Sequence, residues 1–196
     1  MSQTSWKPLS KGTVAGGLVS FLAHGLGWSV LPFTNRAIHD FNAPERLAVL
    51  SAGASAQPGT YFVNADAARS GLAVPEGVYG WMTLHPASGY AQTGSLGWGL
   101  LINLAMALLV SWLVLRSSAT SFGGRFVIGL AATAFALLAG PIWDLAWAWY
   151  SAPYAVAVGL NVLLGGLGSA AVIAWLVKPA PRAALGADVS AAVPAT

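Results

Sequence analysis

The chain has 196 residues, of which 56% are hydrophobic and only 8% are charged. Soluble domains carry roughly 25% charged residues, so this composition excludes an ordinary soluble enzyme and indicates a membrane protein. The net charge of +3 arises from Lys and Arg residues at the ends of apolar segments rather than from a basic patch, which argues against nucleic-acid binding, and the lack of cysteine excludes disulfides and thiolate chemistry.

Four long apolar segments without Lys or Arg follow one another along the chain. About 20 residues at a rise of 1.5 Å per residue cross the hydrocarbon core of a bilayer, so each segment predicts a transmembrane helix. We therefore expect an all-α membrane protein, a four-transmembrane-helix bundle with a small mixed α/β extracytoplasmic cap between the first two helices. The predicted spans are residues 12–33, 96–115, 126–149 and 153–177.

Six basic residues flank the predicted spans on one side of the membrane: Lys7, Lys11, Arg116, Arg125, Lys178 and Arg182. By the positive-inside rule that side is cytoplasmic, which predicts a multi-pass protein of the bacterial inner membrane with both termini in the cytoplasm. The segments outside the spans are then a cytoplasmic N-terminus at 1–11, the cap at 34–95, a cytoplasmic turn at 116–125, an outer turn at 150–152 and a flexible cytoplasmic tail at 178–196.

The segment expected to form the cap has signals for one helix and two strands. Asn42-Ala43-Pro44-Glu45 resembles a helix start and predicts a short helix that continues to Leu50. The runs 60–63 and 78–84 predict two strands, and each run follows a turn that contains Pro and Gly. Since an isolated hairpin is only marginally stable in water, we expect the cap to be stabilised by contacts with the helix ends, by added strands or by a partner subunit.

Small residues recur at one-turn intervals in the predicted spans. Lipid provides no hydrophobic drive between helices, so close backbone packing and interhelical hydrogen bonds must hold a bundle together. The small residues therefore predict helix-packing faces, either within one protomer or toward a partner or a second copy. The residues concerned are Gly12, Gly16, Gly99, Ala107, Ser111, Gly140, Gly165 and Ser169.

Four polar side chains, one in each predicted span, fall in the outer half of the membrane: His24, Asn103, Asp144 and Asn161. If their faces converge, they form a polar pocket beneath the cap. A carboxylate in hydrocarbon must pair, protonate or reach water, so Asp144 is either a shallow group hydrogen-bonded near the interface or a contact for an ion, proton or ligand. His24 is likewise either a structural imidazole hydrogen-bonded to Asn or Asp across the bundle, or part of a proton relay or ligand site.

The third predicted span indicates how Asp144 would be oriented. Positions four apart share a helix face, so an inward Asp144 also directs Ala132, Ala136 and Gly140 toward the bundle. Pro141 should kink the helix just before the carboxylate. We expect Asp144 to lie within hydrogen-bonding reach of another member of the polar set or of a cap group.

No catalytic, nucleotide-binding or metal-binding signature accompanies these groups. Ser-His-Asp, phosphate-loop and dinucleotide patterns are absent, and no second histidine stands at ligand spacing, so we expect neither an enzyme nor a metal or cofactor. The packing faces and small cap favour a non-enzymatic accessory or scaffold subunit of a larger membrane complex, or a homo-oligomer, with the lipid bilayer and a membrane protein as partners. The alternative is transport or sensing of a small molecule or proton through the outer-leaflet pocket.

Short motifs near the span ends resemble those of uncharacterised bacterial inner-membrane proteins of about this length. They are Trp28-Ser29-Val30-Leu31-Pro32-Phe33, Pro58-Gly59-Thr60-Tyr61, Gly124-Arg125 and Ala174-Trp175-Leu176-Val177-Lys178-Pro179. The resemblance covers most of the chain and implies a four-helix inner-membrane protein, but it brings no activity and no functional residue. The large outer loop followed by short turns is also similar to claudin-like four-helix proteins, although the Trp and paired-Cys signature of their loop is missing.

Overall fold

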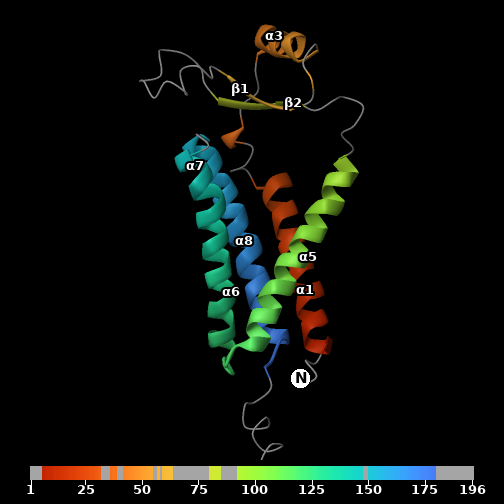
Figure 1. The fold of residues 1–196 in the computed structure, drawn as a ribbon, viewed down its shortest axis with the longest axis vertical. Coiled ribbons are helices and arrows are strands. Elements are labelled where there is room, and N and C mark those ends of the chain that lie inside the picture. The colour runs from red at the N-terminus through yellow and green to blue at the C-terminus, as the bar shows by residue number, and fades with distance from the viewer. Residues whose placement is uncertain are drawn as a thin grey trace, which may run out of the picture.

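The computed structural model describes residues 6–31, 36–38, 42–54, 57, 59–63, 80–84, 92–147 and 150–179. Long helices dominate these residues and form an elongated bundle, with a small helix and a two-stranded sheet beyond one end (Figure 1). The long helices are α1 (Trp6–Ser29), α5 (Gln92–Arg116), α6 (Phe122–Leu137) and α8 (Ala152–Leu176). We call the end nearest the sheet the cap end, and the end that carries the α5–α6 turn, residues 117–121, the turn end.

Three described segments are long and apolar enough to cross a membrane, namely Ser95–Arg116, Phe122–Ala146 and Ala152–Leu176. The expectation of a mostly helical chain with long apolar helices able to cross a membrane is therefore confirmed for three of the four predicted spans. Large apolar side chains cover the outside of these helices, with Leu109 61% exposed, Phe135 72% exposed and Trp175 68% exposed. Side chains of this kind would face water in a soluble protein, whereas lipid accommodates them.

The helices pack as a row in which α8 lies along both α1 and α6, and α1 lies along α5. Glycines permit the closest approaches: a Cβ on Gly12 of α1 would lie 2.3 Å from Val177, and one on Gly129 of α6 would lie 2.4 Å from Cβ of Ala170. The two ends of the row, α5 and α6, share far fewer contacts, and Figure 1 shows α5 leaning away from α6 toward the cap end. The bundle is therefore open on this side.

Arg125 links α6 to α8 and to the α5–α6 turn at the turn end. Ser121 caps α6 by accepting a hydrogen bond from N of Gly124 at 3.1 Å, so α6 begins earlier than predicted and Arg125 belongs to its first turn. The side chain of Arg125 is buried; its Nε donates to the carbonyl oxygen of Ala174 at 2.7 Å, and Nη1 donates to that of Thr120. A cation at the carbonyls of the last turn of α8 complements the negative end of that helix.

The third apolar segment changes its winding near Pro141. After α6 the chain forms a π-helical turn, η1 (Leu138–Ile142), and then the short helix α7 (Trp143–Trp147). Proline has no N–H and its ring clashes with the preceding turn of an α-helix, and the wider π-helical turn takes up this mismatch. At the position where a kink is expected, the helix therefore changes its pitch. The chain then continues into α7, which carries Asp144.

The cap has the expected helix and strand pair. Asn42 and Glu45 cap helix α3 (Ala43–Ala54) reciprocally, because N of Glu45 donates to Oδ1 of Asn42 and N of Asn42 donates to Oε2 of Glu45, both at 3.1 Å. Strand β1 (Gly59–Val63) pairs antiparallel with β2 (Gly80–Leu84), with Gly59 opposite Leu84. The start of the second predicted strand at 78–79, the ends of two predicted spans at 32–33 and 148–149, and the tail from 180 onward lie outside the described residues.

Candidate functional site

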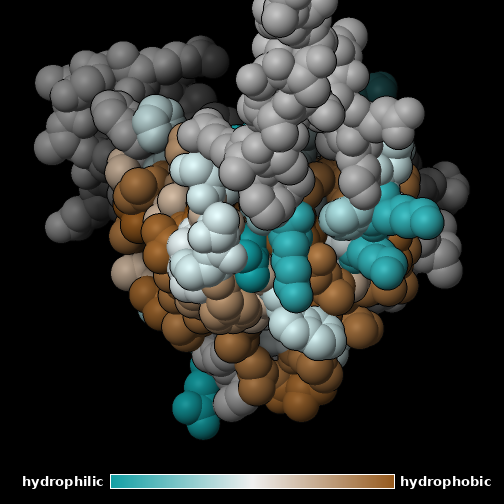
Figure 2. Space-filling model, turned by 90° about the horizontal axis from the view of Figure 1, so that it is seen from below, coloured by the Kyte–Doolittle hydropathy of each residue, from teal (hydrophilic) through white to brown (hydrophobic). Residues whose placement is uncertain are grey.

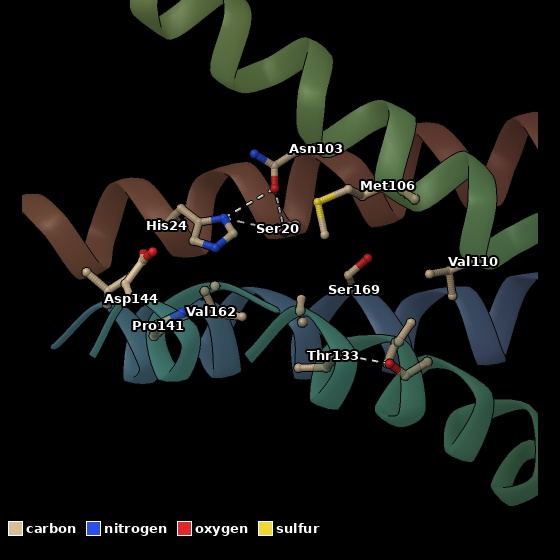
Figure 3. Close-up of a pocket in the computed structure, with 18 residues that line it drawn as sticks. Ser20, His24, Asn103, Met106, Val110, Thr133, Pro141, Asp144, Val162 and Ser169 are labelled. Carbon is tan, nitrogen blue, oxygen red and sulfur yellow. Dashed lines mark hydrogen bonds between the residues drawn. The ribbon is translucent and has the colours of Figure 1, made fainter. Parts of the chain in front are cut away.

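A partly enclosed pocket of about 370 Å³ lies between the helices on the open side of the bundle (Figure 3). Its walls come from α1, α5, α6, η1, α7 and α8, so residues far apart in the sequence contribute to one space. The lining residues are Ser20, His24, Asn103, Met106, Ala107, Val110, Gly129, Ala132, Thr133, Ala136, Gly140, Pro141, Asp144, Val158, Val162, Gly166, Ser169 and Ala170.

A hydrogen-bonded cluster joins α1 to α5 at the cap half of the pocket. Ser20 and His24 are one turn apart and so share a face of α1. The hydroxyl of Ser20 donates to Oδ1 of Asn103 at 2.6 Å, and Nδ1 of His24 lies 3.2 Å from the same oxygen. The amide nitrogen of Asn103 donates to the carbonyl oxygen of Gly99 on its own helix at 2.8 Å. The amide is therefore held with its oxygen toward α1.

This arrangement decides which nitrogen of His24 carries a proton. Because Oδ1 of Asn103 only accepts hydrogen bonds, Nδ1 of His24 must be the donor, and in the neutral ring Nε2 is then unprotonated. Gly165 of α8 makes room for the ring, since a Cβ at this position would lie 2.7 Å from Cε1 of His24. His24 is thus bonded to Asn across the bundle, as the structural interpretation expects, and it also lines the pocket.

Asp144 enters the same pocket from α7. Its side chain is half-buried, and Figure 3 shows the carboxylate directed toward His24 across the cap end of the pocket. Among the described residues no hydrogen bond or salt bridge reaches this carboxylate, so the expected direct bond to the other polar groups is not present there. Ala132, Ala136 and Gly140 line the pocket with Asp144, in keeping with their shared helix face.

Asn161 is the one member of the predicted polar set that lies elsewhere. It is 1% exposed and is not part of the pocket wall. A Cβ on Gly27 would lie 2.3 Å from its Oδ1, which places the amide in the contact between α8 and α1. Neither Oδ1 nor Nδ2 of Asn161 has a hydrogen-bond partner among the described residues. The structure therefore brings together three of the four predicted polar residues.

Besides Ser169, the wall has two further polar side chains, Ser20 and Thr133. Ser20 stands four residues before His24, and this spacing is the sequence signal that could have found it. Thr133 lies next to the small residues of α6, and its hydroxyl donates to the carbonyl oxygen of Gly129 at 2.9 Å. This bond is internal to the helix, so the threonine oxygen keeps lone pairs free to accept.

The small residues predicted to mediate packing fall into two groups. Gly12, Gly16 and Gly165 lie at close helix contacts, and Ala107 and Ser111 are buried on α5. The others differ. Ser169 both packs beside Gly16, where an added Cβ would lie 3.1 Å from its Oγ, and lines the pocket. A Cβ on Gly99 would make only an ordinary van der Waals contact with Phe21, and one on Gly140 would meet nothing within 4 Å. Gly140 therefore opens the pocket instead of packing against a helix.

The ionisable side chains of the pocket lie toward one of its ends, and the hydroxyl groups of Thr133 and Ser169 lie nearer the other (Figure 3). His24, Asn103 and Asp144 lie toward the cap end, and Val110 lies toward the turn end (Figure 3). Within the described part of the chain, no three His, Asp or Glu side chains are grouped as metal ligands. No protein-family model, curated protein or solved structure matches the chain. What the site does must therefore be argued from its own residues.

Proposed function

We propose that the chain is a four-span integral membrane protein whose pocket binds a small amphiphilic molecule, as the ligand site of a sensor or transporter. The observation that carries this proposal is the half-buried carboxylate of Asp144, directed toward His24 at one end of an otherwise mostly apolar pocket of about 370 Å³ (Figure 3). Ligand pockets are typically hundreds of cubic ångströms, largely apolar, with a few convergent polar groups. An ionisable residue at membrane depth is by default a functional-site hypothesis.

The fourth span of this proposal is α1. Its glycines and His24 lower its mean hydropathy, but its 24 residues measure about 36 Å, enough to cross a bilayer. One face is apolar and exposed, with Val14, Leu18, Leu22 and Leu26 at successive turns, while the opposite face carries buried glycines against α8 and α5. This arrangement is typical of a membrane helix whose leucine face contacts lipid and whose glycine face packs against the other helices of the bundle.

The distribution of basic residues indicates how the protein is oriented in the membrane in this proposal. Lys7, Lys11, Arg116, Arg125 and Lys178 all lie at the turn end, and Figure 2, which views that end, shows hydrophilic side chains gathered there with hydrophobic ones around them. Basic residues favour the cytoplasmic side, so the turn end faces the cytoplasm of a bacterial inner membrane and the cap faces outward. The polar end of the pocket then belongs to the outer leaflet.

Access to the pocket is lateral in this proposal. Helix α5 leans away from α6 toward the cap end (Figure 1), and the partly open pocket lies between these helices, where lipid would surround the bundle. A molecule already dissolved in the bilayer can enter between these helices with its polar group toward the cap. Such an entry route suits an amphiphile better than a hydrophilic solute, which would need a path through water.

Binding of a neutral, environment-sensitive fluorescent amphiphile to the full chain in lipid nanodiscs tests the proposal. Ala136→Leu fills the pocket, whereas Ala134→Leu places the same side chain on an exposed position of the same helix. We expect Ala136→Leu to weaken binding about tenfold and Ala134→Leu to leave it unchanged. Equal binding to the wild type and both variants, or to empty nanodiscs, would contradict a ligand pocket.

A second candidate function is that of an accessory subunit or homo-oligomer, in which a helix of a partner or second copy occupies the same opening. The observation that favours it is the row of small residues Ala132, Ala136 and Gly140 along the α6 side of the pocket, with open space at Gly140. Small residues allow close helix approach in membranes. Native mass measurement after mild extraction should then find a stoichiometric partner or a defined oligomer, and a stable monomer would contradict this candidate.

A further inference from the structure

We infer that the pocket is selective for a cation, and that its ligand is a lipophilic amine whose ammonium group pairs with Asp144 while its apolar body lies toward the turn end. This inference rests on the proposed ligand-binding function and names the chemical class of the ligand. It combines three observations on the pocket wall: its charge, its hydrogen-bonding groups and its size.

The charge of the described wall is negative. Asp144 and His24 are the ionisable groups that line it, and no Lys or Arg of the described residues does. The basic side chains of the bundle lie at the turn end, where Arg125 is already bonded to backbone carbonyls. A carboxylate that has no partner among the described residues is costly at this depth, and an ammonium ion in the pocket would pair with it. An anionic ligand would instead be repelled.

The hydrogen-bonding groups near Asp144 are mostly acceptors. The Ser20 hydroxyl donates to Asn103, and the Nδ1 proton of His24 faces the same oxygen, so neither donor is free for a ligand. The amide nitrogen of Asn103 is bonded to its own helix and points away from the cluster in Figure 3. What remains is the carboxylate of Asp144 and, in the neutral ring, Nε2 of His24, both of which accept hydrogen bonds. A primary ammonium group has three donors and no acceptor, which is the complementary set.

The size and shape of the pocket limit the rest of the molecule. A volume of about 370 Å³ is near the small end of ligand pockets, so the ligand is smaller than a membrane lipid. Beyond the end with the ionisable side chains, the wall consists mainly of small and aliphatic side chains, among them Met106 and Val110, together with the hydroxyl groups of Thr133 and Ser169. A short alkyl or aryl-alkyl body is complementary to this part of the pocket.

The test is competition with the neutral fluorescent amphiphile on full-length protein in nanodiscs of neutral lipid. The competitors are 4-phenylbutylamine, 4-phenylbutanol and 4-phenylbutyrate, which share one apolar body and differ in charge. For the wild type we expect the amine to compete about tenfold better than the alcohol, and the butyrate to compete worst. Asp144→Asn keeps the shape of the side chain and should bring the amine to the level of the alcohol, whereas Asp144→Glu should retain part of the preference.

A matched control is Glu45→Gln, which removes one acidic charge from the cap helix and should leave the preference for the amine unchanged. If amine and alcohol compete equally on the wild type, cation selectivity is refuted while the ligand pocket stands. If the preference survives in Asp144→Asn, the role of Asp144 is refuted. If the fluorescent amphiphile itself binds no better to the wild type than to Ala136→Leu, the proposed function fails and this inference fails with it.

Discussion

Gly165 of α8 provides the space that the imidazole of His24 on α1 occupies: a Cβ at Gly165 would lie 2.7 Å from Cε1 and 2.9 Å from Nε2 of the ring. This contact couples a packing residue to a pocket residue. The ring is held on its other side by Asn103, so it has little freedom to move away from an added methyl group.

Gly165→Ala should therefore destabilise the bundle and disturb the pocket. We expect the free energy of unfolding to fall by about 1–3 kcal/mol, the usual effect of overpacking, and amphiphile binding to weaken because the His24 ring shifts from Asn103. Thermal unfolding in one detergent measures the first effect. Gly25→Ala is the matched control, since nothing lies within 4 Å of its added Cβ. Equal stability of the two variants would show that His24 is not confined by Gly165.

The bond between Ser20 and Asn103 should contribute measurably to helix association. Interhelical hydrogen bonds in membranes average about 0.6 kcal/mol, so Ser20→Ala should lower the free energy of unfolding by roughly this amount. Asn103→Ala should lower it more, because both Ser20 and His24 lose their acceptor. A double-mutant cycle on reversible unfolding measures the coupling. Thr13→Val, which removes only a bond within α1, serves as control, and a coupling of zero would contradict the interhelical bond.

Arg125 should stabilise the turn end through its hydrogen bonds and not only through its charge. Arg125→Lys keeps the charge but cannot donate to the carbonyl oxygens of Ala174 and Thr120 in the same geometry, and Arg125→Gln loses the charge as well. The loss of stability should therefore increase in that order, reaching about 1–2 kcal/mol. Hydrogen exchange at N of Val177, which closes the last turn of α8, should become faster. The exposed Arg116, which lies over the ring of Trp112, offers the control Arg116→Gln. Unchanged exchange in Arg125→Gln would rule out this anchoring.

Asn161 and Asn103 should respond in opposite ways to the same substitution. Asn161 is buried without a hydrogen-bond partner among the described residues, so Asn161→Leu should leave stability unchanged or raise it by about 1 kcal/mol, and should leave amphiphile binding intact. Asn103→Leu should reduce both stability and binding, because it removes the acceptor of the pocket cluster. Paired unfolding and binding measurements check this. Loss of binding in Asn161→Leu would place it in the ligand site.

The proposed orientation is testable because the sequence contains no cysteine. A single cysteine at Ser51 in the cap helix should react with a membrane-impermeant maleimide in intact cells, since that side faces outward. A cysteine at Ser118 in the exposed α5–α6 turn should react only after the membrane is permeabilised. The reverse labelling pattern would invert the topology, and labelling of both positions in intact cells would contradict a single span, α5, between them.

Much of the secondary structure could be read from the sequence because it depends on local, one-dimensional properties. The three segments that are apolar enough to cross a membrane are recognised by length and composition alone. The start of α3 follows from Asn42 and Glu45 three residues apart, which cap the helix without help from the rest of the chain. Helix spacing likewise indicates that Ala136, Gly140 and Asp144 share a face.

The tertiary structure alone decided which faces meet. Asn103 and Asn161 both stand in stripes of small residues, and spacing cannot tell that the first reaches Ser20 and His24 whereas the second lies against Gly27 outside the pocket. Helical periodicity determines the relative directions of side chains on one helix, but not the rotation of that helix about its axis or the choice of its neighbours. Those depend on close contacts between helices, such as Gly165 against His24, and on the opening that remains where α5 leans away from α6.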